Sequence, residues 1–254
     1  MKAKIFVLLL SMGTSTFSAV EAKENHTDEK WSIGAAVSHS QSPYKSYDND
    51  TKVWPMLNYS KGKFFIRGKE LGFEVWKSGA HKVDLGVSYY DLEFKRKDTS
   101  NAQLKMLDNR KATMMADISY SFASSTGGIK LKTSFDILDK SNGLLLDISY
   151  RYRLEVNKNL KLNPGLGLEW ANKKQNDYYY GIASTEAMRS GLPSYSAKSG
   201  LTPYLFLEAR YDMSKKLNVF VAGRINFLSS EIKDSPMVGK STTTSVAAGL
   251  QYSF

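Results

Sequence analysis

The chain ends in an alternating apolar–polar segment that finishes on an aromatic residue. Leu250, Tyr252 and Phe254 share one face of this segment, and Phe254 is the last residue of the sequence. Extended backwards, the same face carries Thr242, Thr244, Val246 and Ala248. A period-two run of this length can cross a bilayer at a tilt, whereas a strand of a soluble protein is usually about half as long. The segment therefore predicts the closing strand of a bacterial outer-membrane β-barrel, presented to the insertion machinery.

Residues 1–22 have the pattern of a secretory signal peptide. Lys2 and Lys4 precede an apolar stretch from Ile5 to Leu10, and small residues lead to Ala22. The apolar stretch is too short to span a bilayer as a helix. We expect cleavage after Ala22, which leaves residues 23–254 as a single barrel domain in the outer membrane.

Hydropathy and charge narrow the class further. The mean hydropathy is −0.37, and no later segment is long and apolar enough for a transmembrane helix. A barrel remains possible because half of each strand faces a polar interior. The net charge is +10, and an exported basic protein favours lipopolysaccharide phosphates over nucleic acid as its anionic partner, although a solvated basic surface explains the charge equally well. The chain has no cysteine, so no disulfide stabilises it.

The alternation recurs along the chain and predicts an all-β fold, an antiparallel transmembrane β-barrel of about twelve strands with both termini in the periplasm. Its clearest example runs from Leu144 to Val156. Two short segments, 63–67 and 71–76, give the weakest signal, and about ten strands remain if they do not form. Prolines 55, 164 and 203 fall inside expected strands, where a missing backbone donor suggests bulges or bends.

The connections sort by length. Those expected at the periplasmic side are tight, whereas the opposite side receives four long connections, which are 40–52, 95–107, 171–200 and 229–241. This separation is typical of outer-membrane barrels and supports the assigned topology.

Strand parity places many charged residues in the lumen: Lys130, Lys132, Asp136, Asp147, Arg151, Arg153, Glu155, Lys161, Glu169, Glu208, Arg210 and Arg224. Such residues either line a selective channel or pair with one another and fill the interior. We favour pairing, because a barrel of this size is narrow.

The sequence offers no catalytic constellation. Its three histidines, His26, His39 and His81, fall at separate places and lack an evident Ser or Asp partner. No His and Cys cluster has metal-ligand spacing, and no acidic segment has the pattern of a calcium loop. We predict no catalytic residue, no metal site and no cofactor.

The connection 171–200 is the most unusual segment. Its candidate interaction residues are Asn176, Asp177, Tyr178, Tyr179, Tyr180, Gly181, Glu186, Ser190, Gly191 and Tyr195. Clustered tyrosines supply large contact area at low entropic cost. The segment is therefore either a surface for a partner or a plug folded into the barrel mouth, and the sequence does not decide between them.

These same residues carry a resemblance to the MipA/OmpV family. Further matches include the run from Pro55 to Tyr59, the pair Leu107 and Arg110, and the terminal segment 249–254, whereas Ser46 departs from the family pattern near the first outer loop. The resemblance implies a non-enzymatic outer-membrane barrel. It also implies a scaffold that joins a lytic transglycosylase to a penicillin-binding protein in peptidoglycan synthesis and remodelling. The alternative is a channel, or a surface receptor or adhesin, that uses the long outer loops.

Overall fold

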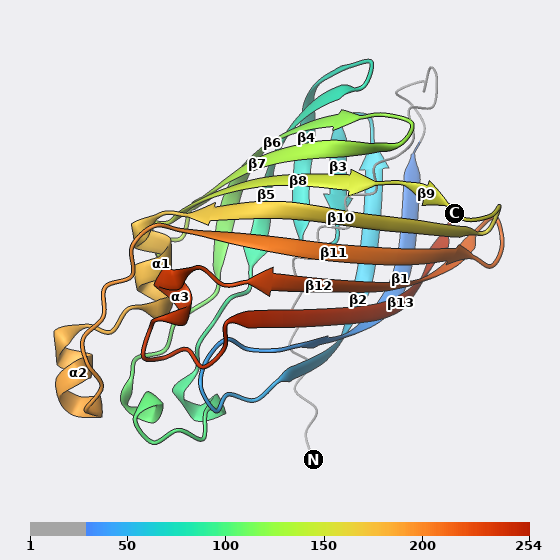
Figure 1. Ribbon diagram of the computed structural model, residues 1–254. Coiled ribbons are helices and arrows are strands. Elements are labelled where there is room, and N and C mark those ends of the chain that lie inside the picture. The colour runs from blue at the N-terminus through green and yellow to red at the C-terminus, as the bar shows by residue number, and fades with distance from the viewer. Residues whose placement is uncertain (1–28) are drawn as a thin grey trace.

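The alternating segments form strands that close into one antiparallel barrel in a computed structural model, which describes residues 29–254 (Figure 1). The expected signal peptide, 1–22, lies outside the described residues. Two strand pieces, β8 and β9, follow one another against the same neighbour, so the labelled segments amount to a twelve-stranded barrel. The predicted fold class and strand number are confirmed.

The strands follow chain order around the barrel, and β13 returns to pair with β1. Their bounds are β1 (Lys30–Ser40), β2 (Asp50–Lys61), β3 (Phe64–Arg67), β4 (Glu70–Ser78), β5 (His81–Tyr90), β6 (Thr113–Ala123), β7 (Gly127–Asp136), β8 (Leu144–Tyr152), β9 (Leu154–Glu155), β10 (Leu160–Ala171), β11 (Gly200–Asp212), β12 (Leu217–Phe227) and β13 (Thr242–Ser253). The helices are η1 (Arg96–Asp98), η2 (Leu104–Met106), α1 (Lys173–Tyr180), α2 (Ser184–Ser190) and α3 (Ser230–Lys233). Within residues 29–254, no helix has the length and apolar character needed to cross a membrane.

Each strand shows an apolar outer face and a more polar inner face. On β1, Ile33 and Val37 are each 45% exposed, while the adjacent Ser32 and Ser38 are buried. On β13, Val246 and Leu250 point outwards in the same way, and Gln251 is buried. Because successive side chains alternate between faces, the predicted period-two pattern places the apolar set where lipid would contact it.

The chain ends are joined by aromatic stacking. The rings of Trp31 and Phe254 are parallel, with centroids 3.6 Å apart, and Tyr252 meets Phe254 edge-on at 5.0 Å. The backbone N–H of Phe254 also donates to the carbonyl of Trp31 at 3.2 Å. The terminal phenylalanine therefore completes the β1–β13 seam at the tight-turn end of the barrel.

The three strand prolines do not produce bulges, which excludes one of the two alternatives, bulges or bends, that the sequence suggested. The pairings of Pro55 with Ala35, of Pro164 with Leu207 and of Pro203 with Leu168 lie in continuous registers. Each proline instead lies where its strand lacks a paired neighbour on the other side. Pro164 faces the break between β8 and β9, and Pro203 lies one residue beyond the β11–β12 ladder. A residue without a backbone donor is tolerated at such a position.

The β3–β4 hairpin is real but short. β3 pairs with only the last four residues of β2, from Asn58 to Lys61. The one register shift between named strands in the described chain lies on β4, between Glu74 and Trp76. The extra residue there, Val75, lets both Val75 and Trp76 face outwards.

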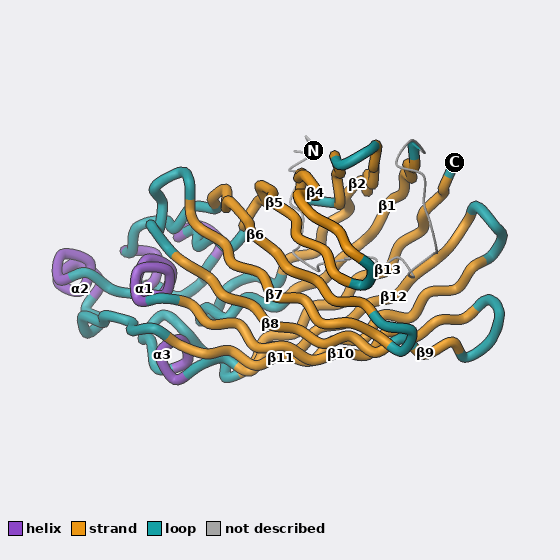
Figure 2. The backbone as a smooth tube through the Cα atoms, turned by 90° about the horizontal axis from the view of Figure 1, so that it is seen from above, coloured by secondary structure: helices purple, strands orange, loops and turns teal. Residues whose placement is uncertain are grey.

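Figure 2 shows the long loops and helices at one end of the barrel and tight turns at the other. The four long connections are 41–49, 91–112, 172–199 and 228–241, close to the predicted ranges. We call their joint assembly the outer cap. The opposite end, predicted to face the periplasm, is the periplasmic rim.

The β1–β13 seam is expected to be sensitive to one added methyl group. A Cβ at Gly34 would collide with the backbone carbonyl of Leu250, whereas a Cβ at Gly223 on β12 has its nearest neighbour at 3.9 Å. We expect Gly34→Ala to reduce the folded fraction and Gly223→Ala to leave it unchanged. The measurement is the heat-sensitive gel mobility of refolded protein. Equal folding of both variants would contradict the assigned seam geometry.

Candidate functional site

The outer cap is a folded unit built from segments far apart in sequence. Four isolated bridges lie within it: Tyr44 with Val238, Tyr47 with Thr99, Phe94 with Arg110, and Ile182 with Tyr195. Two of these bridges connect the first long loop, one to the second loop and one to the fourth, so backbone hydrogen bonds join these loops.

An aromatic and aliphatic core lies inside the outer cap. Its fully buried members come from all four loops and include Tyr44, Phe94, Leu107, Tyr179 and Met237. The rings of Tyr44 and Phe94 meet edge-on at 4.9 Å. The Tyr44 hydroxyl donates to the Tyr179 carbonyl at 3.2 Å. Burial, followed by the nearby Tyr180, raises the pKa of Tyr44 well above its ordinary value, so this hydroxyl stays a neutral donor.

A buried ion pair joins the second loop to the third. Arg110 donates to both carboxylate oxygens of Glu186, at 3.0 and 2.9 Å, and to the carbonyl of Gly181 at 3.0 Å. Glu186 also accepts from the backbone N–H groups of Asp108 and Ala183, at 2.8 and 3.0 Å. The carboxylate therefore has four donors, and this bidentate geometry is the strongest form of an arginine–carboxylate contact.

The environment of Glu186 fixes its charge. Burial raises the pKa of the Glu186 carboxyl, but hydrogen bonds from Arg110 and from the N–H groups of Asp108 and Ala183 outweigh burial, so the net pKa is lowered. The carboxylate is therefore ionised at neutral pH, and Arg110 keeps a charged partner.

Most of the sequence-predicted interaction residues belong to this cap. Asn176, Tyr179, Tyr180, Gly181, Glu186 and Ser190 are buried, whereas Asp177, Tyr178 and Tyr195 are half-buried and Gly191 is exposed. Gly191 ends α2 with φ 71°, a left-handed conformation that favours glycine. The polar members bind neighbouring backbone: Asn176 donates to the Lys198 carbonyl at 2.8 Å, and Asp177 accepts from the Ala197 N–H at 2.9 Å.

The other loops contribute residues that the sequence did not single out as a site. Ser235 donates to the Tyr180 carbonyl at 2.6 Å, and Tyr195 donates to the Glu231 carbonyl at 2.9 Å. Buried apolar residues of the first and fourth loops, such as Tyr44 and Val238, complete the core. Leu107 and Arg110 carried a signal, through their place in the family resemblance.

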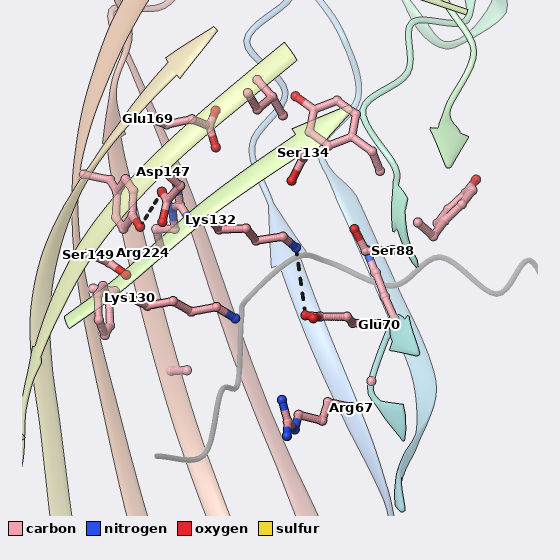
Figure 3. Close-up of a pocket in the computed structure, with 18 of the residues that line it drawn as sticks. Arg67, Glu70, Ser88, Lys130, Lys132, Ser134, Asp147, Ser149, Glu169 and Arg224 are labelled. Atoms are coloured by element: carbon pink, nitrogen blue, oxygen red, sulfur yellow. Dashed lines mark hydrogen bonds and ion pairs between the residues drawn. The ribbon is translucent and has the colours of Figure 1, made fainter. Parts of the chain in front are cut away.

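The lumen holds a cavity of about 220 Å³ lined by charged residues from several strands. Figure 3 shows Lys130 and Lys132 reaching across it from β7 towards Glu70 and Arg67. Lys132 lies 3.0 Å from Asp117 and 3.9 Å from Glu70.

The lumen residues predicted by parity are found mostly as expected. Seven of them line this cavity: Lys130, Lys132, Asp147, Arg151, Glu169, Glu208 and Arg224. Asp147 accepts from the Tyr204 hydroxyl at 2.8 Å, and Arg224 stacks over the Tyr204 ring at 3.5 Å. Asp136, by contrast, accepts from the N–H groups of Leu138, Ser141 and Asn142 and so holds the turn after β7. Among these residues, Lys132 forms ion pairs with Asp117 and Glu70 on other strands, whereas Asp147 and Arg224 both contact Tyr204.

The histidines lie apart. His39 contacts the Thr51 hydroxyl at 2.8 Å near the outer end, and His81 contacts the Tyr120 hydroxyl at 2.6 Å near the periplasmic rim. His26 lies outside the described residues. Between residues 29 and 254, no group of three His, Asp or Glu side chains is arranged to hold a metal ion.

The periplasmic rim is basic. Its tight turns, 62–63, 79–80, 124–126, 156–159 and 213–216, contain no acidic residue. The turns and the strand ends beside them expose Lys61, Lys63, Lys77, Lys158, Lys215 and Lys216. The rim therefore presents a ring of exposed lysines, with the acidic residues Glu29, Glu155 and Asp212 at the strand ends beside it.

Comparison with known proteins gives a family match over nearly all of the described chain. The family model "MltA-interacting protein MipA" matches residues 33–254. The MltA-interacting protein of Escherichia coli is 37% identical over 246 residues, covering 97% of this chain and 98% of that protein. The outer membrane protein OmpV of Vibrio cholerae is 24% identical over 176 residues, covering 69% and 65%.

Among solved structures, the NanC porin gives a TM-score of 0.46 at 10% identity, covering 87% of this chain and 98% of that one.

The buried arginine should matter far more than its exposed neighbour. Arg110 and Arg189 both contact Glu186, but their side chains are 9% and 44% exposed. We expect Arg110→Gln to destabilise the outer cap by about 3 kcal/mol or more, because it leaves Glu186 buried and unpaired. We expect Arg189→Gln to cost less than about 1 kcal/mol. Hydrogen exchange of segments 91–112 and 172–199 measures both, and equal effects would contradict this assignment.

The outer cap should loosen in acid. Because the pKa of Glu186 is lowered by folding, its contribution to stability is complete above the ordinary glutamate pKa, about 4.3, and is lost as the pH falls through the lowered value. We expect hydrogen-exchange protection of α2 to hold from pH 7 to about 5 and to decrease below about 4. Glu186→Gln should be less protected at pH 7 and should lose this dependence. An unchanged pH profile in the variant would refute the role of Glu186.

Proposed function

We infer the function of this chain from its family, because it belongs to the MipA family of outer-membrane proteins. We propose that it is a non-enzymatic scaffold that binds a murein-processing enzyme. The Escherichia coli relative is named for its interaction with MltA, and the similarity to it extends over nearly the whole of both chains. A lytic transglycosylase is the first partner this suggests, and a penicillin-binding protein is the second.

The basic periplasmic rim is the observation that carries this proposal. Murein lies in the periplasm, so a scaffold must present its contact surface on that side of the membrane. The turns there are too short to form a deep pocket, and they offer a flat ring of exposed lysines instead. Such a ring suits an acidic surface on a folded partner, because complementary charge speeds association and fixes orientation.

The packing of the outer cap also favours the periplasmic side as the surface that binds a partner. Its tyrosines pack mainly against one another and against neighbouring backbone, as the buried Tyr44 and Tyr179 show. Few of the clustered aromatic residues are therefore left to bind a partner from outside. The candidate interaction residues of segment 171–200 are best explained by cohesion of the outer cap.

A channel or surface receptor is the second candidate. The charged cavity in the lumen favours it, since rows of ionisable side chains can select ions. Single-channel recording in planar bilayers separates the candidates. The scaffold proposal expects no steady conductance from the intact protein, and a stable, charge-selective conductance would support the channel.

Charge reversal on the rim tests the scaffold directly. The variant carries Lys63→Glu, Lys77→Glu, Lys158→Glu and Lys215→Glu, one change in or beside each of four turns. We expect its Kd for a purified lytic transglycosylase of the MltA type to rise by about tenfold or more, because several rim charges of about 0.5 kcal/mol each are reversed. The unmodified protein should also bind more weakly as salt increases.

A matched control reverses four exposed lysines on the outer cap: Lys97→Glu, Lys105→Glu, Lys173→Glu and Lys233→Glu. This control has the same net charge and should bind like the unmodified protein. Equal loss in both variants would show that the rim is not the contact surface. No binding by the unmodified protein to either class of murein enzyme would overturn the scaffold proposal.

A further inference from the structure

The barrel wall is interrupted beside β2. Above Asn58, no strand within residues 29–254 pairs with the side of β2 that faces away from β1. The interruption arises because β3 and β4 meet in a turn at Gly68 and Lys69, well below the outer end of β2. Two neighbouring strands stop there, so up to two strand widths of wall, about 10 Å, are missing.

The directions of the N–H and C=O groups of β2 show which residues face this gap. The carbonyl of Leu57 accepts from the Gly68 N–H at 3.2 Å, so residue 57 directs its backbone groups towards β3. Backbone direction alternates along a strand, so Pro55, Val53 and Thr51 direct theirs to the same side. Pro55 is the residue without an N–H, which accords with an edge that lacks a partner.

We call this gap in the backbone ladder the window, and its edges are defined by hydrogen bonds. Its lower edge is the hairpin tip, where the Lys69 carbonyl also accepts from the Tyr89 N–H at 3.3 Å. Its upper edge is the contact between the first two loops, where the Asp48 N–H donates to the Asp98 carbonyl at 3.1 Å. β2 forms one side, and the outer end of β5 with the segment after it forms the other.

The lumen cavity reaches this window. Its lining includes Trp54 and Met56 on β2, Gly68 and Lys69 at the hairpin tip, and Tyr89 on β5. Outside the window, Val53 is 76% exposed on the surface that the barrel presents to lipid. The cavity and the outer apolar surface are thus separated by an incomplete wall.

The cavity is divided in polarity. Near the window, Trp54 and Met56 belong to an apolar cluster with Ala36 and Phe220. The cationic lining residues are Arg67, Lys69, Lys130, Lys132, Arg151 and Arg224, and the acidic ones are Glu70, Asp147, Glu169 and Glu208. Cationic side chains therefore outnumber acidic ones among the residues that line the cavity, next to an apolar surface at the entrance. Three of these cations also have carboxylate partners outside the lining: Arg67 with Asp84, Lys69 with Asp91 and Lys132 with Asp117.

We propose that the cavity binds a single-chain amphiphile with an anionic head group, which enters sideways from the membrane through the window. The head group would be held by Lys130 and Lys132, whose ammonium groups extend into the cavity (Figure 3). The acyl chain would lie along Trp54 and Met56 and leave past Val53. A cavity of about 220 Å³ is small beside typical ligand sites of about 300–1,000 Å³, which favours one chain over two.

The outer cap covers the outer end of the cavity, so a ligand from that side of the membrane must enter through the barrel wall. Tyr90 lines the cavity, and its ring meets the ring of Tyr179, in the cap core, at 5.7 Å. Gln175 of α1, buried beside Tyr179, accepts from Ser141 at 2.7 Å and ties the outer cap to the turn after β7. The cap core therefore forms the roof of the cavity.

Fluorescence quenching tests the proposal, because Trp54 is one of only four tryptophans. A variant with Trp31→Phe, Trp76→Phe and Trp170→Phe keeps Trp54 as its single indole. In lipid nanodiscs, we expect ω-bromoundecanoate to quench the fluorescence of Trp54 saturably. Its half-saturating concentration should be about tenfold lower than that of ω-bromoundecyl-trimethylammonium. A second variant that keeps only Trp76, which is 49% exposed on the barrel exterior, should show unsaturable quenching by lipid partitioning alone.

Two further changes test the head-group site and the entrance. Lys130→Gln with Lys132→Gln should raise the half-saturating concentration of the anionic probe about tenfold, whereas Lys97→Gln in the outer cap should not. The chain has no cysteine, so Val53→Cys can be labelled with a bulky maleimide. The label should slow quenching of Trp54, and the same label at Val221→Cys, 59% exposed on β12, should not.

Three results would overturn the proposal. Equal quenching of Trp54 by the anionic and cationic probes would remove the anion preference, and this comparison does not depend on any lysine substitution. Unsaturable quenching of Trp54 would show partitioning without a site. Displacement of the anionic probe by inorganic phosphate at similar concentration would indicate a site for a water-soluble anion instead.

Discussion

Backbone hydrogen bonding within a bilayer is the constraint on which this structure depends. Hydrocarbon offers no partner for an N–H or a C=O group, so strands that cross a membrane must close into a barrel. Here β13 closes on β1 along a continuous register, and the ring of Phe254 stacks on Trp31 where the seam ends. The strand prolines follow the same rule, because each lies where the paired ladder on one side of its strand ends or is interrupted.

The outer cap follows from that closure. Because the barrel closes at the β1–β13 seam, its long loops gather at one end and build a separate core there. The cap joins an aromatic cluster to a buried ion pair, Arg110 with Glu186, whose remaining polar atoms bind backbone groups of the same loops. Such a pair contributes specificity more than net stability, since it is satisfied only when both loops adopt one arrangement. A unique cap conformation suits a roof over the lumen.

The sequence predicted what alternation and loop length can report. Strand number, the inward set of charged residues and the sorting of connections all depend on local pattern, and the structure confirms the barrel with twelve strands. The pattern could not report where the ladder beside a strand ends, so it suggested bulges or bends at the prolines, and the bulges are not found. Nor could it find the bulge at Val75, because one additional apolar residue in a short strand leaves the period ambiguous. The tyrosines were identifiable as a cluster, but only the fold shows that Tyr44 and Phe94 pack against them.

Beside β2, part of the backbone has no neighbouring strand in the described part of the chain with which to form hydrogen bonds. Charged side chains lie near this part of the wall. An unpaired backbone group in hydrocarbon costs several kcal/mol, so a gap of this kind is tolerated only where water or polar side chains can reach it. Lys69 forms an ion pair with Asp91 at 2.7 Å beside the gap, and Lys95 pairs with Glu93 just above it. Charged pairs at this depth would be costly against a continuous wall facing lipid, yet they suit an opening that admits head groups. The charged residues that stabilise the unpaired backbone therefore also make the interior beside the gap polar. An amphiphile requires a polar site next to an apolar strip, and the residues around Trp54 supply that strip.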